Sequence, residues 1–178
     1  LIRTLNVLLI MAPALALAGP PKNYKPSDKG IALPVESFTN GLGVEMKLAD
    51  FSGKLVLLNL WATWCAPCVR DMPHLDKLQA QLGGADFEVI ALSADRGGLS
   101  KVEPFFRRTN IEHLEIYLDP KNNMARRLGA QGLPTTYVIN SDGQILGSVA
   151  GALDWNAPEI VSWLRGIIDQ RQEQASVN

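Results

Sequence analysis

The stretch "KLVLLNLWATWCAPC", residues 54–68, decides the fold because it joins a long apolar run to two closely spaced cysteines. The part from Lys54 to Ala62 is nearly continuous in apolar residues, which is typical of a central strand covered on both faces. Cys65 and Cys68 follow it and are the only cysteines of the 178-residue chain. In α/β sheets the reactive site lies where a strand ends and a helix begins. We therefore expect Cys65 to occupy that position.

Helical and extended patterns alternate on the C-terminal side of the cysteines. Apolar residues recur at helical spacing from Met72 to Leu82, and the pair Gly83-Gly84 ends this helix. Asp142-Gly143 is a strong hairpin signal between two extended segments. Further strands are expected at residues 87–95 and 113–119, further helices at 97–110, 122–130 and 157–170, and hairpins at 38–54 and 135–151.

The alternation predicts an α/β domain of three layers, with a mixed central sheet, an N-terminal β-hairpin and flanking helices. The length fits one domain with its own hydrophobic core. The 17 basic and 18 acidic side chains give a net charge of −1 and form no basic block. Nucleic acid is therefore not expected as a partner.

The first 30 residues divide into two parts of different character. Residues 1–18 are mostly apolar, but the run is shorter than the ~20 residues of a membrane-spanning helix. It ends in Ala16-Leu17-Ala18, a cleavage-site pattern, so we expect a signal peptide that is either cleaved or retained as an N-terminal membrane anchor. Residues 19–30 are expected to be a linker, 31–170 the folded domain and 171–178 a flexible tail. The domain would then be periplasmic, where disulfide chemistry is permitted.

General chemistry offers three interpretations of the cysteine pair. A structural zinc site needs four ligands, and only His74 and His113 could join the cysteines. A structural disulfide across so short a loop would stabilise the fold little, because the entropic gain grows with loop length. A redox dithiol is favoured, because a cysteine at a helix N-terminus is stabilised as a thiolate. Cys65 would be the nucleophile and Cys68 the resolving cysteine, and Pro67 would stiffen the loop between them.

The motif "WATWCAPC" resembles the active site of thioredoxin-fold proteins, in particular the extracytoplasmic TlpA, ResA and CcmG/DsbE group. The resemblance extends from Ile31 to Asp169. It includes "GLPTTYVINSDGQILGSVAG", which is similar to the characteristic proline and terminal hairpin of that group. It implies a thioredoxin-like fold with Cys65–Cys68 as a redox-active disulfide. No cofactor and no bound metal are expected.

The same resemblance implies roles for residues around the cysteines. Pro134 matches the family's cis-proline, which faces the cysteine pair, and the preceding Leu133 would offer its backbone to a substrate strand. Trp64 matches the indole that flanks the site, although surface packing would also account for it. Asn59 stands where thioredoxin has a buried aspartate, and asparagine is usual in the TlpA/ResA branch.

Other positions leave alternatives open. Asp71 matches a glutamate that tunes the thiols in ResA and CcmG, but an acid in the first turns of a helix also simply favours the helix dipole. Thr135 stands where CcmG has a glutamate after the cis-proline, which counts against a CcmG-like role in haem maturation. His74 is available as a copper ligand, although a lone helical histidine is more often a surface residue.

Together these features imply an extracytoplasmic thiol–disulfide oxidoreductase, an enzyme that reduces disulfides of partner proteins. Its expected partners are protein thiols and disulfides in cytochrome c or cytochrome oxidase assembly or in redox homeostasis, and a membrane electron donor of the DsbD/CcdA type. Two alternatives are a peroxiredoxin-like enzyme, whose P-x-x-x-T/S-x-x-C motif is absent, and a copper metallochaperone that would use Cys65, Cys68 and His74.

Overall fold

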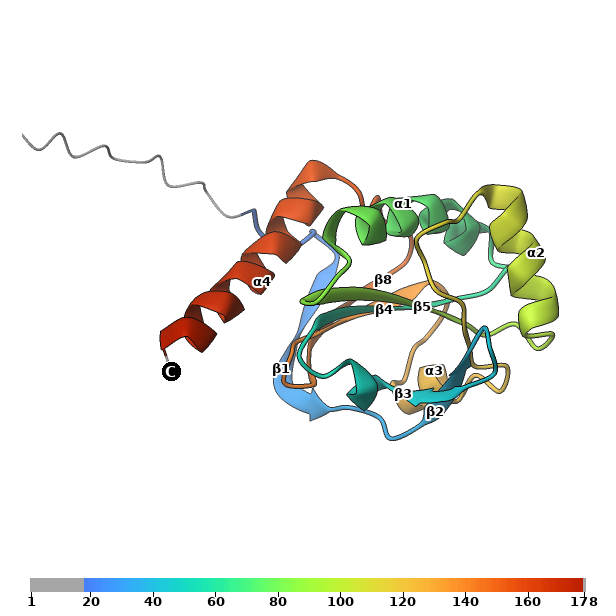
Figure 1. The fold of residues 1–178 in the computed structure, drawn as a ribbon, viewed down its shortest axis with the longest axis horizontal. Coiled ribbons are helices and arrows are strands. Elements are labelled where there is room, and N and C mark those ends of the chain that lie inside the picture. The colour runs from blue at the N-terminus through green and yellow to red at the C-terminus, as the bar shows by residue number, and fades with distance from the viewer. Residues whose placement is uncertain (1–17, 178) are drawn as a thin grey trace, which may run out of the picture.

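The computed structural model describes residues 18–177, and an eight-stranded mixed sheet forms their centre (Figure 1). The strands lie in the order β1-β8-β7-β4-β5-β6-β2-β3. They are β1 (Tyr24–Ala32), β2 (Ser37–Asn40), β3 (Glu45–Lys47), β4 (Leu55–Trp61), β5 (Phe87–Ser93), β6 (Tyr117–Leu118), β7 (Thr135–Ile139) and β8 (Gln144–Ala150). The helices are the 3-10 helix η1 (Leu48–Phe51) and the α-helices α1 (Ala66–Leu82), α2 (Leu99–Thr109), α3 (Asn123–Arg127) and α4 (Pro158–Val177).

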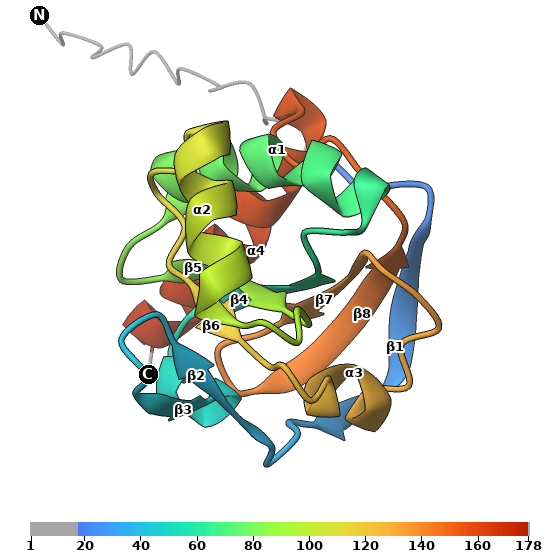
Figure 2. The ribbon, with the colours of Figure 1, turned by 90° about the vertical axis from the view of Figure 1, so that its right-hand side faces the viewer.

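The expected central strand is β4, which pairs in parallel with β5 and antiparallel with β7. All seven of its residues are buried, as its continuous apolar pattern predicts. Its side chains alternate between two cores: Leu57 and Trp61 face α1, α2 and α4, whereas Val56 and Leu58 face α3, η1 and β2. Figure 2 shows α1 and α2 on one side of the sheet and α3 on the other. The predicted three-layer α/β fold is confirmed.

Helix α1 begins directly after the first cysteine. Cys65 is its N-cap residue, with an extended backbone (φ −88°, ψ 99°), and Pro67 lies in its first turn, where the missing N–H is not needed. The helix ends where the Gly83 N–H bonds to the Gln79 carbonyl. Its apolar face, which includes the fully buried Met72 and Leu75, fixes the helix against the sheet.

The two predicted hairpins have turns of the same construction. In the β2–β3 turn, Asn40 Oδ1 accepts hydrogen bonds from the backbone N–H groups of Leu42 and Val44. The β7–β8 turn uses Asn140 Oδ1 in the same way. In both turns the fourth residue is a glycine with positive φ, +79° for Gly43 and +76° for Gly143, a conformation that glycine adopts without strain.

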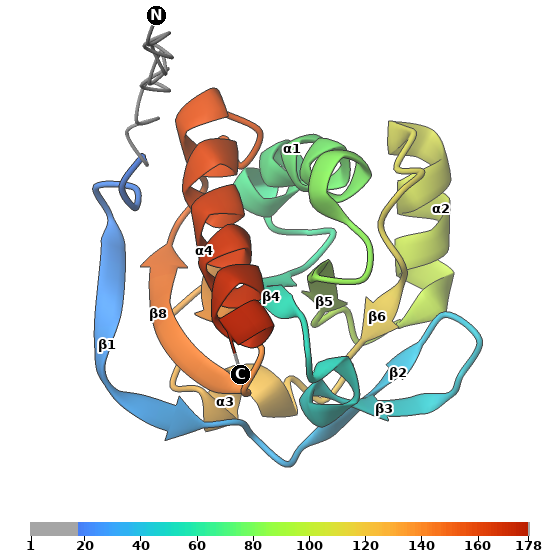
Figure 3. The ribbon, with the colours of Figure 1, turned by 60° about the vertical axis from the view of Figure 1, so that its left-hand side comes forward.

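The segment expected as a linker is largely a strand. β1 begins at Tyr24 and pairs antiparallel with β8 at the edge of the sheet (Figure 3). Pro26 is compatible with this position because an edge strand does not need every N–H for pairing. The Tyr24 ring also packs edge-on against Trp163 of α4, with centroids 5.2 Å apart. β1 lacks the apolar pattern of a typical strand, and backbone pairing and the packing of the Tyr24 ring hold it in place.

Two further segments differ from their predicted extent. β6 is only two residues long. The beginning of the expected strand is bonded to α1 and not to the sheet, because Asp76 Oδ1 accepts the backbone N–H groups of residues 112–114. The tail expected to be flexible from residue 171 continues α4 to Val177, and the Arg171 side chain pairs with Asp86. The chain from residue 171 to 177 therefore prolongs the last helix.

The predicted signal peptide or anchor, residues 1–18, lies almost entirely outside the described residues, and its nature stays a prediction. Within residues 18–177, no helix has both the length and the apolar character needed to cross a membrane. The core of the described chain is instead shared between the two faces of the sheet.

Candidate active site

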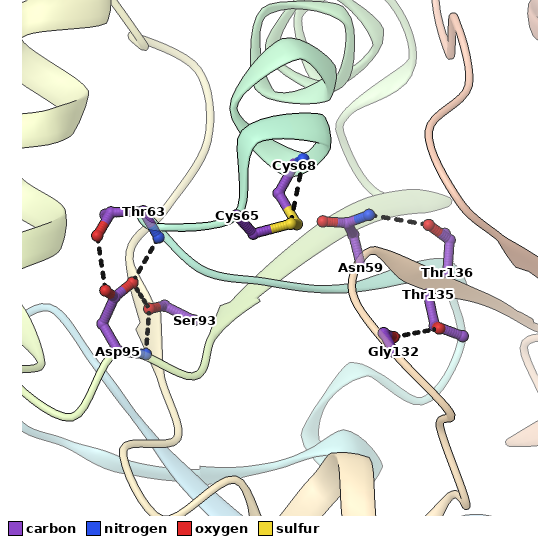
Figure 4. Close-up of a disulfide and its surroundings, with 9 residues drawn as sticks. All are labelled: Asn59, Thr63, Cys65, Cys68, Ser93, Asp95, Gly132, Thr135 and Thr136. Atoms are coloured by element: carbon purple, nitrogen blue, oxygen red, sulfur yellow. Dashed lines mark hydrogen bonds between the residues drawn. A yellow bond between two sulfur atoms is a disulfide. The ribbon is translucent and has the colours of Figure 1, made fainter.

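The cysteine pair lies where β4 leads into α1, as the sequence predicts. Cys65 and Cys68 are joined in a disulfide, and the Cys68 N–H donates a hydrogen bond to Cys65 Sγ at 3.3 Å (Figure 4). Cys65 is 6% exposed and Cys68 is fully buried, so of the two cysteines only Cys65 reaches the surface. When the pair is reduced, the free N–H groups and the dipole of α1 stabilise a thiolate at Cys65.

A buried carboxylate holds the loop that precedes Cys65. Asp95 accepts hydrogen bonds from the Thr63 backbone N–H (2.8 Å) and the Thr63 hydroxyl (2.6 Å). It also accepts one from the Ser93 hydroxyl at 2.9 Å. β4 and β5 are parallel, so their carboxyl ends meet at the same edge and bring these residues together. Sequence analysis missed Asp95, although an acidic residue at the carboxyl end of an apolar strand pattern was the available signal.

A second polar pair lies on the other side of the disulfide from Asp95 (Figure 4). Asn59 is fully buried in β4, and its Nδ2 donates to the Thr136 hydroxyl of β7 at 2.8 Å. Asn59 Oδ1 has no hydrogen-bond partner among the described residues. An amide cannot ionise, so this position carries no proton to or from the cysteines.

The peptide bond between Leu133 and Pro134 is cis, which confirms the conformation predicted for Pro134. Two contacts fix the segment around it. The Thr135 hydroxyl donates to the Gly132 carbonyl at 2.7 Å, and the Pro134 carbonyl accepts from the Gly151 N–H at 2.9 Å. The chain therefore enters β7 beside the disulfide in a defined conformation (Figure 4).

Asp71 is buried inside the protein on α1, three residues after Cys68, and its side chain has an unusual environment. The residue is 3% exposed, and Oδ2 has no hydrogen-bond partner in the described chain. Burial raises the pKa of the Asp71 carboxyl to about 7, and the Leu153 N–H and the charges of His74 and Arg70 oppose this only in part. Near neutral pH this carboxyl can therefore either hold or release a proton.

His74, the residue considered above as a copper ligand, has a different partner. Its Nδ1 contacts Asp154 Oδ1 in the loop before α4, and both side chains are substantially exposed. Within residues 18–177, no group of three or more His, Cys, Asp or Glu side chains is arranged to hold a metal ion. The two cysteines are thus bonded to each other, and His74 is paired with Asp154.

A groove of about 970 Å³ opens beside Cys65. It brings together four of the predicted site residues, Trp64, Cys65, Pro67 and Leu133, with Trp64 exposing 70% of its surface. The groove is completed by Ala94, Asp95, Arg96, Gly97, Lys101, Pro120, Lys121, Asn122, Arg126 and Gly132. Cys68 and Asp71 do not line it and lie in the interior along α1.

A mixed sheet, a C-x-x-C disulfide at a strand-to-helix junction and a cis-proline define the thioredoxin-like class. Comparison with known proteins agrees, because residues 26–162 match the Redoxin family. The chain is 32% identical over 124 residues to the thiol-disulfide oxidoreductase ResA of Geobacillus kaustophilus, and this alignment covers 70% of each protein. It is 32% identical over 109 residues to ResA of Bacillus thuringiensis, covering 61% of this chain and 62% of that relative.

A solved structure gives the same result. The crystal structure of a Chlorobium tepidum protein assigned as thiol:disulfide interchange protein DsbE superposes with a TM-score of 0.70 at 27% identity. The superposition covers 79% of this chain and 98% of the other. The chain therefore belongs to the Redoxin family, and its similarity to ResA and DsbE confirms the predicted TlpA/ResA/CcmG group. The matched part spans about 62% of the length of several ResA relatives.

Proposed function

We propose that this protein is a thiol–disulfide oxidoreductase that exchanges electrons with partner proteins through Cys65 and Cys68. The observation that carries the proposal is the position of Cys65. It caps α1, lines a groove and is followed one turn later by a fully buried partner cysteine. A disulfide that closes so short a loop stabilises the fold little, so a redox role explains the cysteine pair better than a structural one.

In the direction of substrate reduction, the reaction starts from the dithiol. The Cys65 thiolate attacks one sulfur of a partner disulfide, so that the partner S–S bond breaks and one partner thiolate leaves. Cys68 then loses its proton and attacks Cys65 Sγ in the mixed disulfide. The Cys65–Cys68 bond forms, the second partner thiolate leaves, and two electrons have passed to the partner.

Asp71 is our candidate for accepting the proton from Cys68. It lies three residues further along the same helix, on its buried side. Its carboxyl has a pKa raised to about 7 by burial, so it can take up a proton near neutral pH. An Asp71→Asn variant should then form the mixed disulfide at the normal rate but resolve it more slowly.

The direction, the location and the partners are also part of the proposal. We infer a reductase that acts outside the cytoplasm on disulfides in cytochrome c or cytochrome oxidase assembly or in redox homeostasis, and that receives electrons from a membrane donor of the DsbD/CcdA type. The resemblance to ResA and DsbE and the signal-like residues 1–18 support this. Thr135, where CcmG has glutamate, favours a ResA-like over a CcmG-like role.

Single cysteine variants test the assignment of roles. Cys68→Ser should accumulate mixed disulfides with partner proteins through Cys65, whereas Cys65→Ser should accumulate none. Mass spectrometry of the trapped proteins would identify the partners and the direction of electron flow. Equal trapping by both variants would contradict the roles, and turnover of hydrogen peroxide without reduction of insulin would favour a peroxiredoxin-like enzyme instead.

A further inference from the structure

The groove beside Cys65 carries a strong excess of positive charge. Its lining includes four cations, Arg96, Lys101, Lys121 and Arg126, all of them exposed. The one acidic residue of the lining is Asp95, which is buried and already accepts hydrogen bonds from Thr63 and Ser93. The chain as a whole has a net charge of −1, so the positive charge of the groove differs from the charge balance of the whole protein.

None of these four cations has a carboxylate partner within the part of the chain that the structure describes. The Arg126 guanidinium is held by two neutral oxygens, the Lys121 carbonyl and Asn123 Oδ1. By contrast, Arg107 on the same helix as Lys101 pairs with Glu103. The groove therefore keeps its charge uncompensated, whereas the nearby Arg107 and Arg127, which do not line it, are paired with Glu103 and Glu36.

The cations come from two separate segments of the chain, and both segments line the groove. Arg96 and Lys101 belong to the connection after β5 and the first turn of α2. Lys121 and Arg126 belong to the connection after β6 and to α3 (Figure 2). A chain segment bound in this groove beside Cys65 would therefore lie among positive side chains from both segments.

We propose that the groove selects substrates in which acidic residues flank the reactive cysteine of a polypeptide. This inference rests on the proposed function, because the acidic segment is that of the protein whose disulfide Cys65 attacks. Complementary charge at such a site raises the association rate and discriminates against cationic partners. The exposed Trp64 and the half-buried Leu133 supply apolar contact next to the sulfur.

The direct test uses three cyclic peptides with one disulfide each, identical except that the cysteines are flanked by Glu, Gln or Lys. The rate of their reduction by the dithiol protein is measured in about 20 mM and about 500 mM salt, which bracket strong and weak screening. At low salt we expect the Glu peptide to react roughly tenfold faster than the Gln peptide, and the Lys peptide to react slowest. At high salt the three rates should converge to within about threefold, because salt screens exposed charges.

Charge reversal in the groove gives a second measurement. In Arg96→Glu/Lys121→Glu, which changes one residue in each of the two segments, the order of the peptides should reverse. Lys77→Glu is the matched control, because Lys77 is exposed on α1 about 18 Å from Cys65 at the rise of about 1.5 Å per helical residue. It should keep the order of the wild type. Circular dichroism would show that both variants are folded.

The outcomes separate the two proposals. If all three peptides react at the same rate in low salt, the acidic preference is wrong while the oxidoreductase function stands. If none of the peptides reacts, the proposed function itself fails. Co-sedimentation with vesicles of anionic lipid that is lost in the double variant, together with equal peptide rates, would assign the charge to a membrane surface and overturn the inference.

Discussion

Two buried aspartates, Asp95 and Asp71, lie near the disulfide and differ in almost every contact. Both are 3% exposed. Asp95 accepts three hydrogen bonds from Thr63 and Ser93, whereas Asp71 Oδ2 has no hydrogen-bond partner among the described residues. Burial, which the Leu153 N–H and the charges of His74 and Arg70 compensate only in part, raises the pKa of Asp71 to about 7. Two equally buried aspartates therefore differ in role: Asp95 holds a loop, and Asp71 can bind a proton.

The difference shows that burial alone does not assign a role to a carboxylate. The hydrogen-bond donors around Asp95 make it a fixed acceptor for the loop that leads to Cys65. The environment of Asp71 favours the neutral acid, so folding and proton binding are coupled there. Replacing Asp95 should consequently cost much more stability than replacing Asp71.

The largest effect is expected for Asp95→Ala. It leaves the partly buried Thr63 N–H and hydroxyl and the buried Ser93 hydroxyl without their acceptor, and an unsatisfied buried group costs about 1–3 kcal/mol. We expect the free energy of unfolding at pH 8 to fall by about 3–5 kcal/mol in urea titrations. Asp71→Ala is the matched control and should lose much less. Equal losses at the two positions would remove the distinction between them.

The second effect is the pH dependence of stability, which Asp71→Asn should change. The raised pKa means that the folded protein retains the Asp71 proton while the unfolded chain, with a pKa near 3.8, has lost it. Stability of the wild type therefore falls as pH rises from about 4 to about 7, and the loss is complete above about pH 7. The amide introduced by Asp71→Asn cannot ionise, so the variant should equal the wild type near pH 4 and exceed its stability at pH 8.

The size of this effect has an upper limit. At about 1.4 kcal/mol per pKa unit, a shift from 3.8 to about 7 corresponds to at most roughly 4 kcal/mol. Partial access of water to the site reduces this, and we expect a difference of about 2 kcal/mol at pH 8. Urea unfolding of the oxidised protein at pH 4, 6 and 8 measures it. A difference that does not change with pH would show that Asp71 is ionised in the fold.

A smaller effect is expected for Thr63→Val, which removes one donor from Asp95 but keeps the backbone N–H. Hydrogen bonds to charged groups contribute about 1.5–3 kcal/mol, and we expect a loss near the lower value. Thr63→Ser retains the hydroxyl and should recover most of the stability. If valine and serine behave alike in thermal unfolding, the hydroxyl does not contribute to holding this loop.

The smallest effect is expected on the opposite side of the disulfide. Thr136→Val removes the acceptor of Asn59 Nδ2, a bond between two neutral groups that contributes about 1 kcal/mol. Thr136→Ser is the control that keeps the acceptor. A loss as large as that of Asp95→Ala would mean that the two sides of the disulfide are equally important for stability, contrary to the comparison.

The sequence predicted the features that depend on local order along the chain. The apolar run of β4, the N-terminal position of Cys65 on α1 and the hairpin at Gly143 follow from periodicity and turn chemistry, and the cis conformation at Pro134 followed from resemblance. The contact of Asp95 with Thr63 was not predictable in the same way, because it joins residues 32 positions apart. Only the parallel pairing of two strands brings them together.

The positive groove and the edge strand were missed for the same physical reason. The cations of the groove come from two connections that are separated in the sequence by a strand. They form no local cluster of charge from which the groove could be predicted. β1 has few apolar residues of its own and exists because β8 offers an open edge. Short β6 likewise depends on a distant side chain, Asp76.

The edge strand β1 has a consequence for behaviour at high concentration. Without it, the outer edge of β8 would present unpaired N–H and C=O groups on which another chain could add a strand and start aggregation. β1 covers this edge and in turn carries Lys25 and Pro26, residues that oppose strand addition. The protein thus protects the hairpin that follows its cis-proline from self-association with a segment whose composition resembles a linker.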